Sequence, residues 1–182
     1  MKEAYIDQIL QFWFEEIPPK DWFTKNPDFD ERLRQTFGDL VEDAIGARLD
    51  SWAKTKKGRL ALILLLDQMT RNIHRDTPKA FAGDEMALAL SLRAVHDGFL
   101  EDSTMQECQF FLMPMMHAED LNIQQTSIPL FETYTHEEVA KFAHKHKDIV
   151  ARFGHFPHRN AILGRPSTDE EIRFLEEPGS SF

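Results

Sequence analysis

The segment Leu60-Ala-Leu-Ile-Leu-Leu-Leu-Asp-Gln-Met-Thr-Arg-Asn72 decides the fold. Its first seven residues are apolar on every face of a helix, which is typical of a helix surrounded by other helices. The run is far shorter than the roughly 20 residues that a membrane-spanning helix needs. The segment therefore predicts a buried helix in a helical protein. Its polar end begins at Asp67, and Arg71 follows four residues later, a spacing that allows the two side chains to pair on one face.

Helical periodicity continues on both sides of this segment, and no run of four or more residues alternates as a strand with hairpin punctuation does. The pattern predicts further helices over about 3–17, 26–51, 84–96 and 122–134, with Asn26 and Asp84 as caps. Proline ends the first of them at Pro18 and the buried helix at Pro78. Three more helices are predicted to begin at capping boxes, in which a Thr is followed three residues later by a Glu: Thr104/Glu107, Thr135/Glu138 and Thr168/Glu171.

We therefore expect an all-α fold of about seven or eight helices, forming a single domain over residues 1–182. Short connections between helices suit either a compact bundle or an irregular stack of antiparallel helices of the solenoid type. No clean internal repeat is visible, so a stack of hairpins would have to be irregular.

Charge and cysteine content exclude several classes of protein. The chain has 21 basic and 31 acidic residues, a formal charge of -10, and its basic residues are scattered. Long-range attraction to nucleic acid or to anionic lipid is therefore not expected. Polar residues such as Asp7 and Glu15 interrupt the start of the chain, so we expect no signal peptide. The single cysteine, Cys108, fits a core position in a reducing compartment, which predicts a cytoplasmic protein without membrane spans.

A second informative segment is the loop Phe153-Gly-His-Phe-Pro-His-Arg-Asn-Ala-Ile-Leu-Gly-Arg165. Loops with this density of polar groups lie on the surface and often carry function. The segment matches no phosphate-binding, zinc-protease or nucleophile motif. Two charged or titratable groups fall on apolar stripes, His146 in the helix after Thr135 and Glu119 after Thr104. A buried carboxylate at Glu119 would need an arginine, hydrogen bonds or a proton.

Several segments together resemble an uncharacterised family, domain of unknown function 924. They are Asp67-Gln-Met-Thr-Arg-Asn72, Thr77-Pro-Lys-Ala-Phe-Ala82 with Asp84, His117-Ala-Glu119 and Gly154–Arg165. The resemblance implies a tetratricopeptide-like superhelix, found largely in bacteria, and brings no established activity, substrate or cofactor. This chain departs from the family at His155, where an Arg is common, and at Met69-Thr70, where Phe-Pro is common. A histidine would hold an anion more weakly and in a pH-dependent way.

The first functional hypothesis is a binding module whose concave side presents arginine, histidine and asparagine to a small anionic ligand or a carboxylate-bearing peptide. The arginine fork matches a carboxylate or phosphate with two hydrogen bonds. The residues predicted for this site are Asp67, Arg71, Asn72, His117, Glu119, His158, Arg159, Asn160 and Arg165.

Two alternatives remain open. An enzyme would use His158 or His117 as general acid or base, oriented by Glu119 or Asp67, although no nucleophile stands out and activity stays uncertain. The spacing of His117, Glu119, His155 and His158 is a weak metal signal, and we predict no metal and no cofactor. In the structural alternative the polar network locks the helices together, and function resides on an outer surface that binds a protein partner. A homodimer is compatible with the run Phe12-Trp-Phe14.

Overall fold

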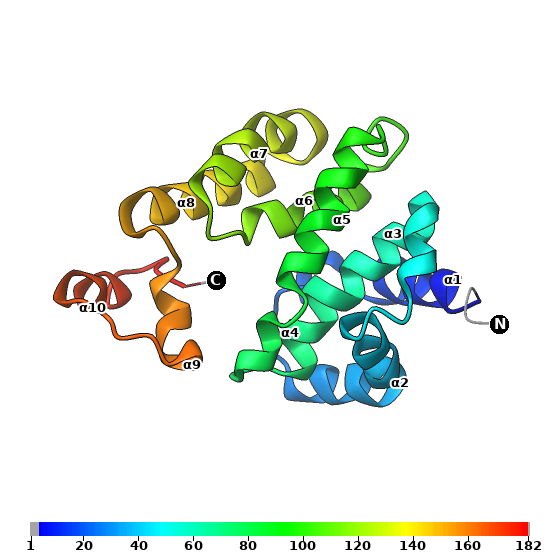
Figure 1. Ribbon diagram of the computed structural model, residues 1–182, viewed down its shortest axis with the longest axis horizontal. Helices are drawn as coiled ribbons and strands as arrows, with labels where there is room; N and C mark the ends of the chain where they lie inside the picture. Colours follow the sequence, from blue (N-terminus) through cyan, green and yellow to red (C-terminus); the bar gives the residue numbers. More distant parts are fainter. Residues whose placement is uncertain (1–3, 182) are drawn as a thin grey trace.

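The computed structural model describes residues 4–181, and every regular element in that part of the chain is a helix (Figure 1). The expected all-α fold is thus confirmed. None of the described helices combines the length and the apolar character needed to cross a lipid bilayer. The elements in chain order are α1 (Ala4–Gln11), η1 (Phe12–Glu16), η2 (Pro19–Asp21), α2 (Pro27–Ile45), η3 (Asp50–Lys54), α3 (Lys56–Ile63), η4 (Leu64–Met69), α4 (Thr70–Ile73), η5 (Pro78–Phe81), α5 (Asp84–His96), α6 (Met105–Met116), α7 (Leu121–Tyr134), α8 (Glu137–Phe153), η6 (Pro157–Arg159), α9 (Asn160–Leu163) and α10 (Asp169–Leu175).

The predicted buried helix is formed by α3, η4 and α4, which follow one another without a break. It begins at Thr55, whose side chain accepts a hydrogen bond from the Gly58 backbone, and every residue from Gly58 to Thr70 is buried. Its middle part, η4, is π-helical, and the Thr70 hydroxyl donates to the Leu65 carbonyl oxygen at 2.6 Å. A π-helical turn is wider than an α-helical turn and is often found at functional sites. Asp67 and Gln68 lie in this wider turn.

The first helix also ends in a π-helical turn, η1, before Pro18 and Pro19 stop it. On a regular α-helix three consecutive aromatic residues could not all face the core. Here Phe12 and Trp13 are buried, and Phe14 is half-buried and packs against the same core. The rings of Trp13, Phe14 and Trp22 surround Phe110 of α6 at centroid distances of 5.6, 5.6 and 4.9 Å. Three consecutive aromatic residues are thus accommodated within one chain.

Several predicted helix ends are confirmed and three differ. Asn26 caps α2, and the boxes at Thr104 and Thr168 are complete. By contrast, α2 ends at Ile45 instead of near residue 51, because the chain turns at Gly46 and Ala47 has a positive φ of 57°. The other two differences concern Asp84, which lies inside α5 and does not cap it, and Thr135, whose hydroxyl donates to the Phe131 carbonyl at the end of α7.

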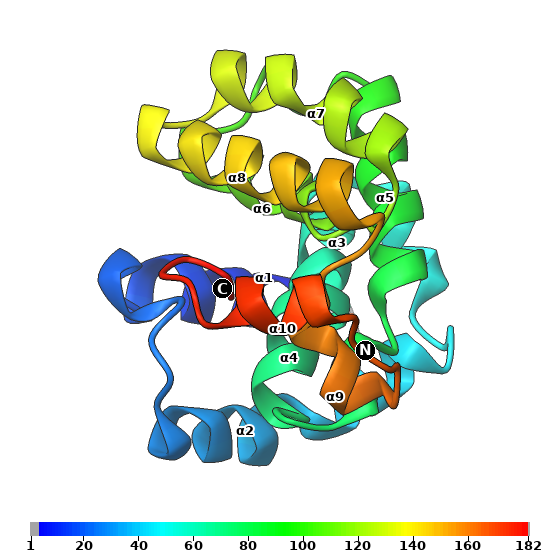
Figure 2. The ribbon, with the colours of Figure 1, turned by 90° about the vertical axis from the view of Figure 1, so that its left-hand side faces the viewer.

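The helices form a large body and a smaller C-terminal lobe (Figure 1). From α5 to α8, each helix packs against the next along the chain. The chain turns at Gly154, which adopts a left-handed φ of 77°, and continues into η6, α9 and α10. Figure 2 shows α7 and α8 above, α2 and α4 below, and the C-terminal lobe toward the viewer. The apolar core is correspondingly divided into one extensive cluster and a small one made of Ile149, Val150, Phe156 and Phe174.

Candidate functional site

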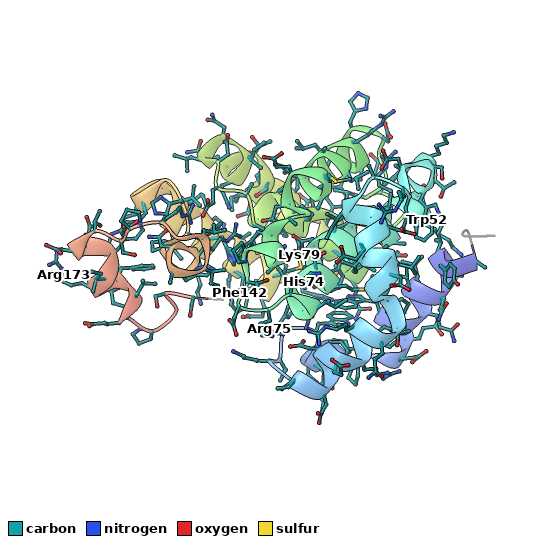
Figure 3. All side chains as sticks on the ribbon, turned by 60° about the horizontal axis from the view of Figure 1, so that its bottom comes forward. Trp52, His74, Arg75, Lys79, Phe142 and Arg173 are labelled. Atoms are coloured by element: carbon teal, nitrogen blue, oxygen red, sulfur yellow. The ribbon has the colours of Figure 1, made fainter. Side chains whose placement is uncertain are left out.

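A pocket of about 790 Å³ lies where the C-terminal lobe meets the body. Its wall combines apolar side chains with arginine and histidine, and it is formed by segments from the N-terminal loop at Trp22 to Ser181 near the end of the chain. In Figure 3, Phe142 and Arg75 of this wall lie between Trp52 at one end of the molecule and Arg173 at the other. The polar side chains of this wall include Gln68, Arg71, Asn72, His117, His146, His158 and Arg159.

Asp67 is the centre of the polar wall, although it lies behind the surface and is completely buried. One carboxylate oxygen lies 2.7 Å from His117 Nδ1 and 3.1 Å from Arg71 Nη1, and the other accepts a hydrogen bond from Gln68 Nε2. Burial alone would raise the pKa of Asp67, but the positive charge of Arg71 and the hydrogen bonds from His117 and Gln68 lower it. The carboxylate is therefore ionised at neutral pH. The predicted Asp67–Arg71 pair is confirmed.

Asp84 joins two arginines that are far apart in the sequence. Its carboxylate accepts two hydrogen bonds from Arg71, at 2.8 and 3.0 Å, and a longer one from Arg159 at 3.4 Å. The start of α5 can lie this close to η4 because Gly83 has no side chain. A Cβ atom there would lie 2.3 Å from the Leu66 carbonyl oxygen. Gly83 thus allows the backbones of α5 and η4 to approach and places Asp84 beside Arg71.

Arg159, in η6 of the C-terminal lobe, reaches into the body and contacts Asp84 and the His117 backbone. Its side chain is almost fully buried, and its guanidinium lies 4.8 Å from the ring centre of Phe81 and 4.6 Å from that of Phe156. Its Nη2 donates to the His117 carbonyl oxygen at 3.0 Å. Burial and the nearby charge of Arg71 lower the pKa of Arg159 to about 10, so it is still a cation at neutral pH. The surrounding protein compensates this charge incompletely.

Three histidines of the pocket are neutral at pH 7. Burial lowers the pKa of His146 to about 3 and that of His158 to about 4, and neighbouring positive charges act in the same direction. Burial also lowers the pKa of His117, and this effect outweighs the attraction of the proton to Asp67. The ring centres of His117 and His146 are 6.1 Å apart. The neutral state of His117 means that Nδ1 carries the proton toward Asp67 and that Nε2 is an acceptor.

The structure separates the predicted site residues into two groups. Asp67, Arg71, His117, His158 and Arg159 are at or directly behind the pocket wall. Asn72 also lines the pocket, but its amide nitrogen donates to Asp30 at 2.7 Å.

The other three, Glu119, Arg165 and Asn160, are engaged away from the wall. Arg165 donates to both oxygens of Glu119, at 2.7 and 2.9 Å, and the Phe156 backbone donates to the same carboxylate at 2.8 Å. Asn160 is buried and donates to Ser167 at 3.1 Å. The sequence predicted an arginine, hydrogen bonds or a proton at Glu119, and the structure provides the first two at a half-buried carboxylate. The pairing fastens the C-terminal loop to the loop after α6.

Sequence reasoning missed three members of the site. Asp84 was interpreted as a helix cap, and Phe81 and Gln68 were not considered as site residues. Phe81 contributes one face of the Arg159 stack, and Gln68 fixes the second oxygen of Asp67. The signal that could have found Asp84 is its position beside Gly83, since a glycine at a helix start is compatible with close backbone contact.

The residues considered as metal ligands from their spacing in the sequence are engaged in separate pairs. His117 pairs with Asp67, Glu119 with Arg165, and His155 Nε2 lies 2.6 Å from Glu171. Over residues 4–181 no cluster of three His, Cys, Asp or Glu side chains has the arrangement of a metal site.

Comparisons with known proteins agree with the resemblance noted in the sequence. A family model described as "Bacterial protein of unknown function (DUF924)" matches residues 9–179. The solved structure of ATU0120, a protein of unknown function from Agrobacterium tumefaciens, is 36% identical in sequence and has a TM-score of 0.91. The similarity covers 97% of this chain and 99% of that chain. No curated protein matches the chain.

Proposed function

Because the chain belongs to the DUF924 family of bacterial proteins of unknown function, we propose its function from the pocket: it binds a small molecule with an anionic group and an apolar body. The observation that carries the proposal is the buried Arg159 guanidinium in the wall of a pocket of about 790 Å³. Pockets for small molecules usually measure about 300–1,000 Å³ and combine apolar walls with a few placed polar groups.

The electrostatics of the arginines support an anionic ligand. Arg71 has two near carboxylates, Asp67 and Asp84, which raise its pKa. Arg159 shares one oxygen of Asp84, Oδ2, with Arg71 and lies farther from it, at 3.4 Å, and burial lowers the pKa of Arg159 to about 10. An anion in the pocket would stabilise the charge of Arg159, and a planar carboxylate or phosphate edge matches the guanidinium. Neutral His158 and His117 add groups that can donate to or accept from the ligand.

The remaining wall supports an apolar body on the ligand. Aromatic and aliphatic side chains from five parts of the chain line the same pocket: Trp22, Phe23, Phe81, Met113, Met116, Val139, Phe142 and Ile162. Exposure of Phe23 and Phe142, at 58% and 47%, leaves apolar surface available at this pocket. Flexible methionine side chains adapt to irregular partners. We therefore favour small aromatic or branched aliphatic carboxylates over simple inorganic anions.

The test is a thermal-melt panel of such carboxylates, phosphate monoesters and a short peptide with a free C-terminal carboxylate. A ligand at about 100 times its Kd stabilises a protein by about 2.7 kcal/mol, which corresponds to a rise in melting temperature of about 5–10 °C at this size. Any compound that raises the melting temperature is then tested on Arg159→Lys, which keeps the charge but loses the planar fork. We expect that compound to bind this variant about tenfold more weakly than the wild type. Arg173→Lys, on α10 at the end of the molecule, is the matched control and should bind as the wild type does (Figure 3).

A second candidate function has an observation of its own. Arg159 connects the lobe to the body through Asp84 and the His117 carbonyl, which would suit a purely structural lock. In that case Arg159→Lys would lower the melting temperature while no compound of the panel raised it in either protein. That result would contradict the ligand pocket and leave an outer surface for a protein partner as the functional site.

We also propose a cytoplasmic location and a tetratricopeptide-like stacking of the helices. Support for the first is that the single cysteine, Cys108, is an unpaired, buried thiol whose pKa burial raises to about 11. Support for the second is the packing of each helix on the next from α5 to α8. Fractionation of cells that express a tagged chain tests the location.

A further inference from the structure

We propose that Asp67 and His117 form a general acid–base pair that moves a proton to and from a carbon atom next to a carbonyl group of the bound ligand. The inference rests on the proposed function, because it needs an anionic ligand in the same pocket. The ligand class is then a small carboxylate that carries a ketone group and an apolar substituent. His117 would be the catalytic residue and Asp67 the positioning residue.

The geometry of the pair leaves one imidazole nitrogen for the ligand. Asp67 is completely buried and lies 2.7 Å from Nδ1 of His117, while Gln68 donates to its other oxygen. The carboxylate thus holds the histidine in the tautomer with hydrogen on Nδ1. His117 lines the pocket, and since Nδ1 is engaged by Asp67, Nε2 is the ring nitrogen that we infer meets the ligand. A carboxylate that orients an imidazole in this way is the common arrangement for a histidine general base.

The protonation states suit a base at neutral pH. His117 is neutral because burial lowers its pKa, and Asp67 remains ionised. The charged and titratable groups that face His117 come from all the elements packed around it: Asp67 and Arg71 of the buried helix, Asp84 of α5, His146 of α8, and His158 and Arg159 of η6. Since both histidines among these are neutral at pH 7, the local charge is that of two arginines and two aspartates.

The pocket also contains a means to stabilise the negative charge that proton removal creates. Arg159 donates to the His117 backbone carbonyl, so its guanidinium lies beside the base. Arg159 lies against the rings of Phe81 and Phe156, and in such low-dielectric surroundings a fixed cation stabilises a developing oxyanion strongly. Nucleophilic catalysis has less support, because the hydroxyl side chains among the described lining residues, Thr24 and Ser181, are exposed.

The step is a reversible proton transfer without a co-substrate. His117 Nε2 takes the proton from the carbon next to the ketone, the C–H bond breaks, and its electron pair moves into a C=C bond as the carbonyl oxygen becomes an enolate. Arg159 holds that oxygen. Return of the proton from Nε2 to the same carbon restores the ketone, and return to the neighbouring oxygen gives the enol. In heavy water the proton on Nε2 exchanges with solvent before it returns, so the first route replaces hydrogen by deuterium at that carbon.

The experiment uses the full chain with phenylpyruvate, 2-oxobutanoate and 4-methyl-2-oxopentanoate as probes. Binding is measured as the rise in melting temperature, and exchange as the loss of the C3–H proton NMR signal in heavy water over the rate in buffer. We expect at least one probe to bind and to exchange faster with the protein. His117→Gln should bind that probe and lose the accelerated exchange by about 10²–10⁴-fold. The control His144→Gln, an exposed histidine of α8 paired with Glu132, should exchange as the wild type does.

The pH profile separates positioning from a merely structural role for Asp67. Wild-type exchange should rise with pH through an ionisation below the usual histidine value of about 6.5 and then level off. Asp67→Asn removes the negative charge beside Nδ1, so the midpoint should move to lower pH while the plateau rate falls. If His117→Gln does not fold, the pH profile of the wild type is the deciding test. A wild-type exchange rate that did not depend on pH would overturn the proposal.

The two proposals fail in different ways. Probes that raise the melting temperature but exchange no faster than in buffer would overturn the acid–base pair and leave the ligand pocket standing. Absence of any melting shift with these probes and with the wider carboxylate and phosphate panel would overturn both. Accelerated exchange that survives in His117→Gln would assign the proton transfer to another group and would also overturn this inference.

Discussion

The body of the protein and its C-terminal lobe are held together by different forces. In the body, aromatic and aliphatic side chains form one extensive buried cluster, in which Phe110 is in contact with Trp13, Phe14 and Trp22. A separate, small apolar cluster joins the lobe to the body, because Ile149 and Val150 belong to α8 while Phe156 and Phe174 belong to the lobe. The lobe is also attached by hydrogen bonds and ion pairs, from Glu119 to Arg165 and to the Phe156 backbone, and from Arg159 to Asp84.

The two kinds of packing predict where the molecule opens most easily. Apolar packing in the body involves many contacts at once, whereas a junction made of a small apolar cluster and a few ion pairs can open locally while the rest stays folded. The pocket lies between the two regions, and Arg159 belongs to its wall and to the links. Ligand binding and attachment of the lobe should therefore be coupled.

Two fully buried phenylalanines, Phe110 in the body and Phe156 in the lobe, allow a matched comparison. Replacement of a buried phenylalanine by alanine costs about 3–5 kcal/mol, from lost burial and the cavity that remains. We expect Phe110→Ala to lower the free energy of global unfolding by this amount. Phe156→Ala should instead open the lobe, because the ring packs against His146 and the Arg159 guanidinium.

Urea unfolding and amide hydrogen exchange distinguish these outcomes. In Phe156→Ala the amides of α9 and α10 should exchange much faster, while those of α3 and α6 change little. Uniform acceleration across the chain in both variants would show that the lobe and the body unfold as one unit, and the division into two regions would be wrong.

The second prediction uses pH, because His146 and His158 lie at the junction. Their pKa values are lowered to about 3 and about 4, while in the unfolded chain both titrate near 6.5. Between these values the unfolded chain binds more protons, so the free energy of unfolding falls as the pH drops below about 6.5. Each histidine should contribute about 1–2 kcal/mol to this loss between pH 7 and pH 5.

The measurement is urea unfolding and hydrogen exchange at pH 7 and pH 5. His146→Gln should reduce the pH dependence, and His144→Gln, an exposed histidine on the same helix, should leave it unchanged. Carboxylates whose pKa is lowered, such as Glu119, stabilise the folded chain throughout the range from pH 7 to pH 5. Their stabilisation is lost on protonation only below about pH 4.5, so they do not affect this comparison. Equal stability at the two pH values would contradict the buried neutral state of these histidines.

Local patterns predicted the body better than the lobe, for a physical reason. The enclosed run Leu60 to Leu66 and the Asp67–Arg71 pair depend on neighbours within one helix, where periodicity fixes the geometry. The need of Glu119 for a partner followed from the cost of burying a charge, but periodicity could not name Arg165, which is 46 residues away.

The features that escaped prediction depend on long-range contacts or on departures from regular helices. Asp84 has an acceptable local interpretation as a cap, and its partner Arg159 is 75 residues away in the sequence. The π-helical turns η1 and η4 change which residues share a face, so a pattern of 3.6 residues per turn misplaces them. At Thr135 the composition of a capping box is present, but α8 begins one residue later and the hydroxyl bonds to α7.

The third prediction weakens the link between the lobe and the body. Glu119→Gln replaces the carboxylate that accepts two hydrogen bonds from Arg165 and one from the Phe156 backbone. Charge-assisted hydrogen bonds of this kind contribute about 1–3 kcal/mol, so hydrogen exchange in 157–175 should accelerate accordingly. The control is Glu132→Gln, which removes an exposed pair with His144 and should cost less than about 0.5 kcal/mol. Equal effects of the two substitutions would show that Glu119 does not fasten the lobe.

The smallest effect gives the most direct comparison, because each region has one complete capping box. The Thr104 side chain accepts from the Glu107 backbone at 3.2 Å, and Thr168 accepts from Glu171 at 3.2 Å. Loss of such a cap costs about 1 kcal/mol. We expect Thr104→Ala to lower the free energy of global unfolding, since α6 packs in the body between α5 and α7. Thr168→Ala should leave the urea midpoint nearly unchanged and accelerate exchange only in α10. If Thr168→Ala lowered the global stability as much as Thr104→Ala does, the lobe would unfold together with the body, and the pocket between them could not open on its own.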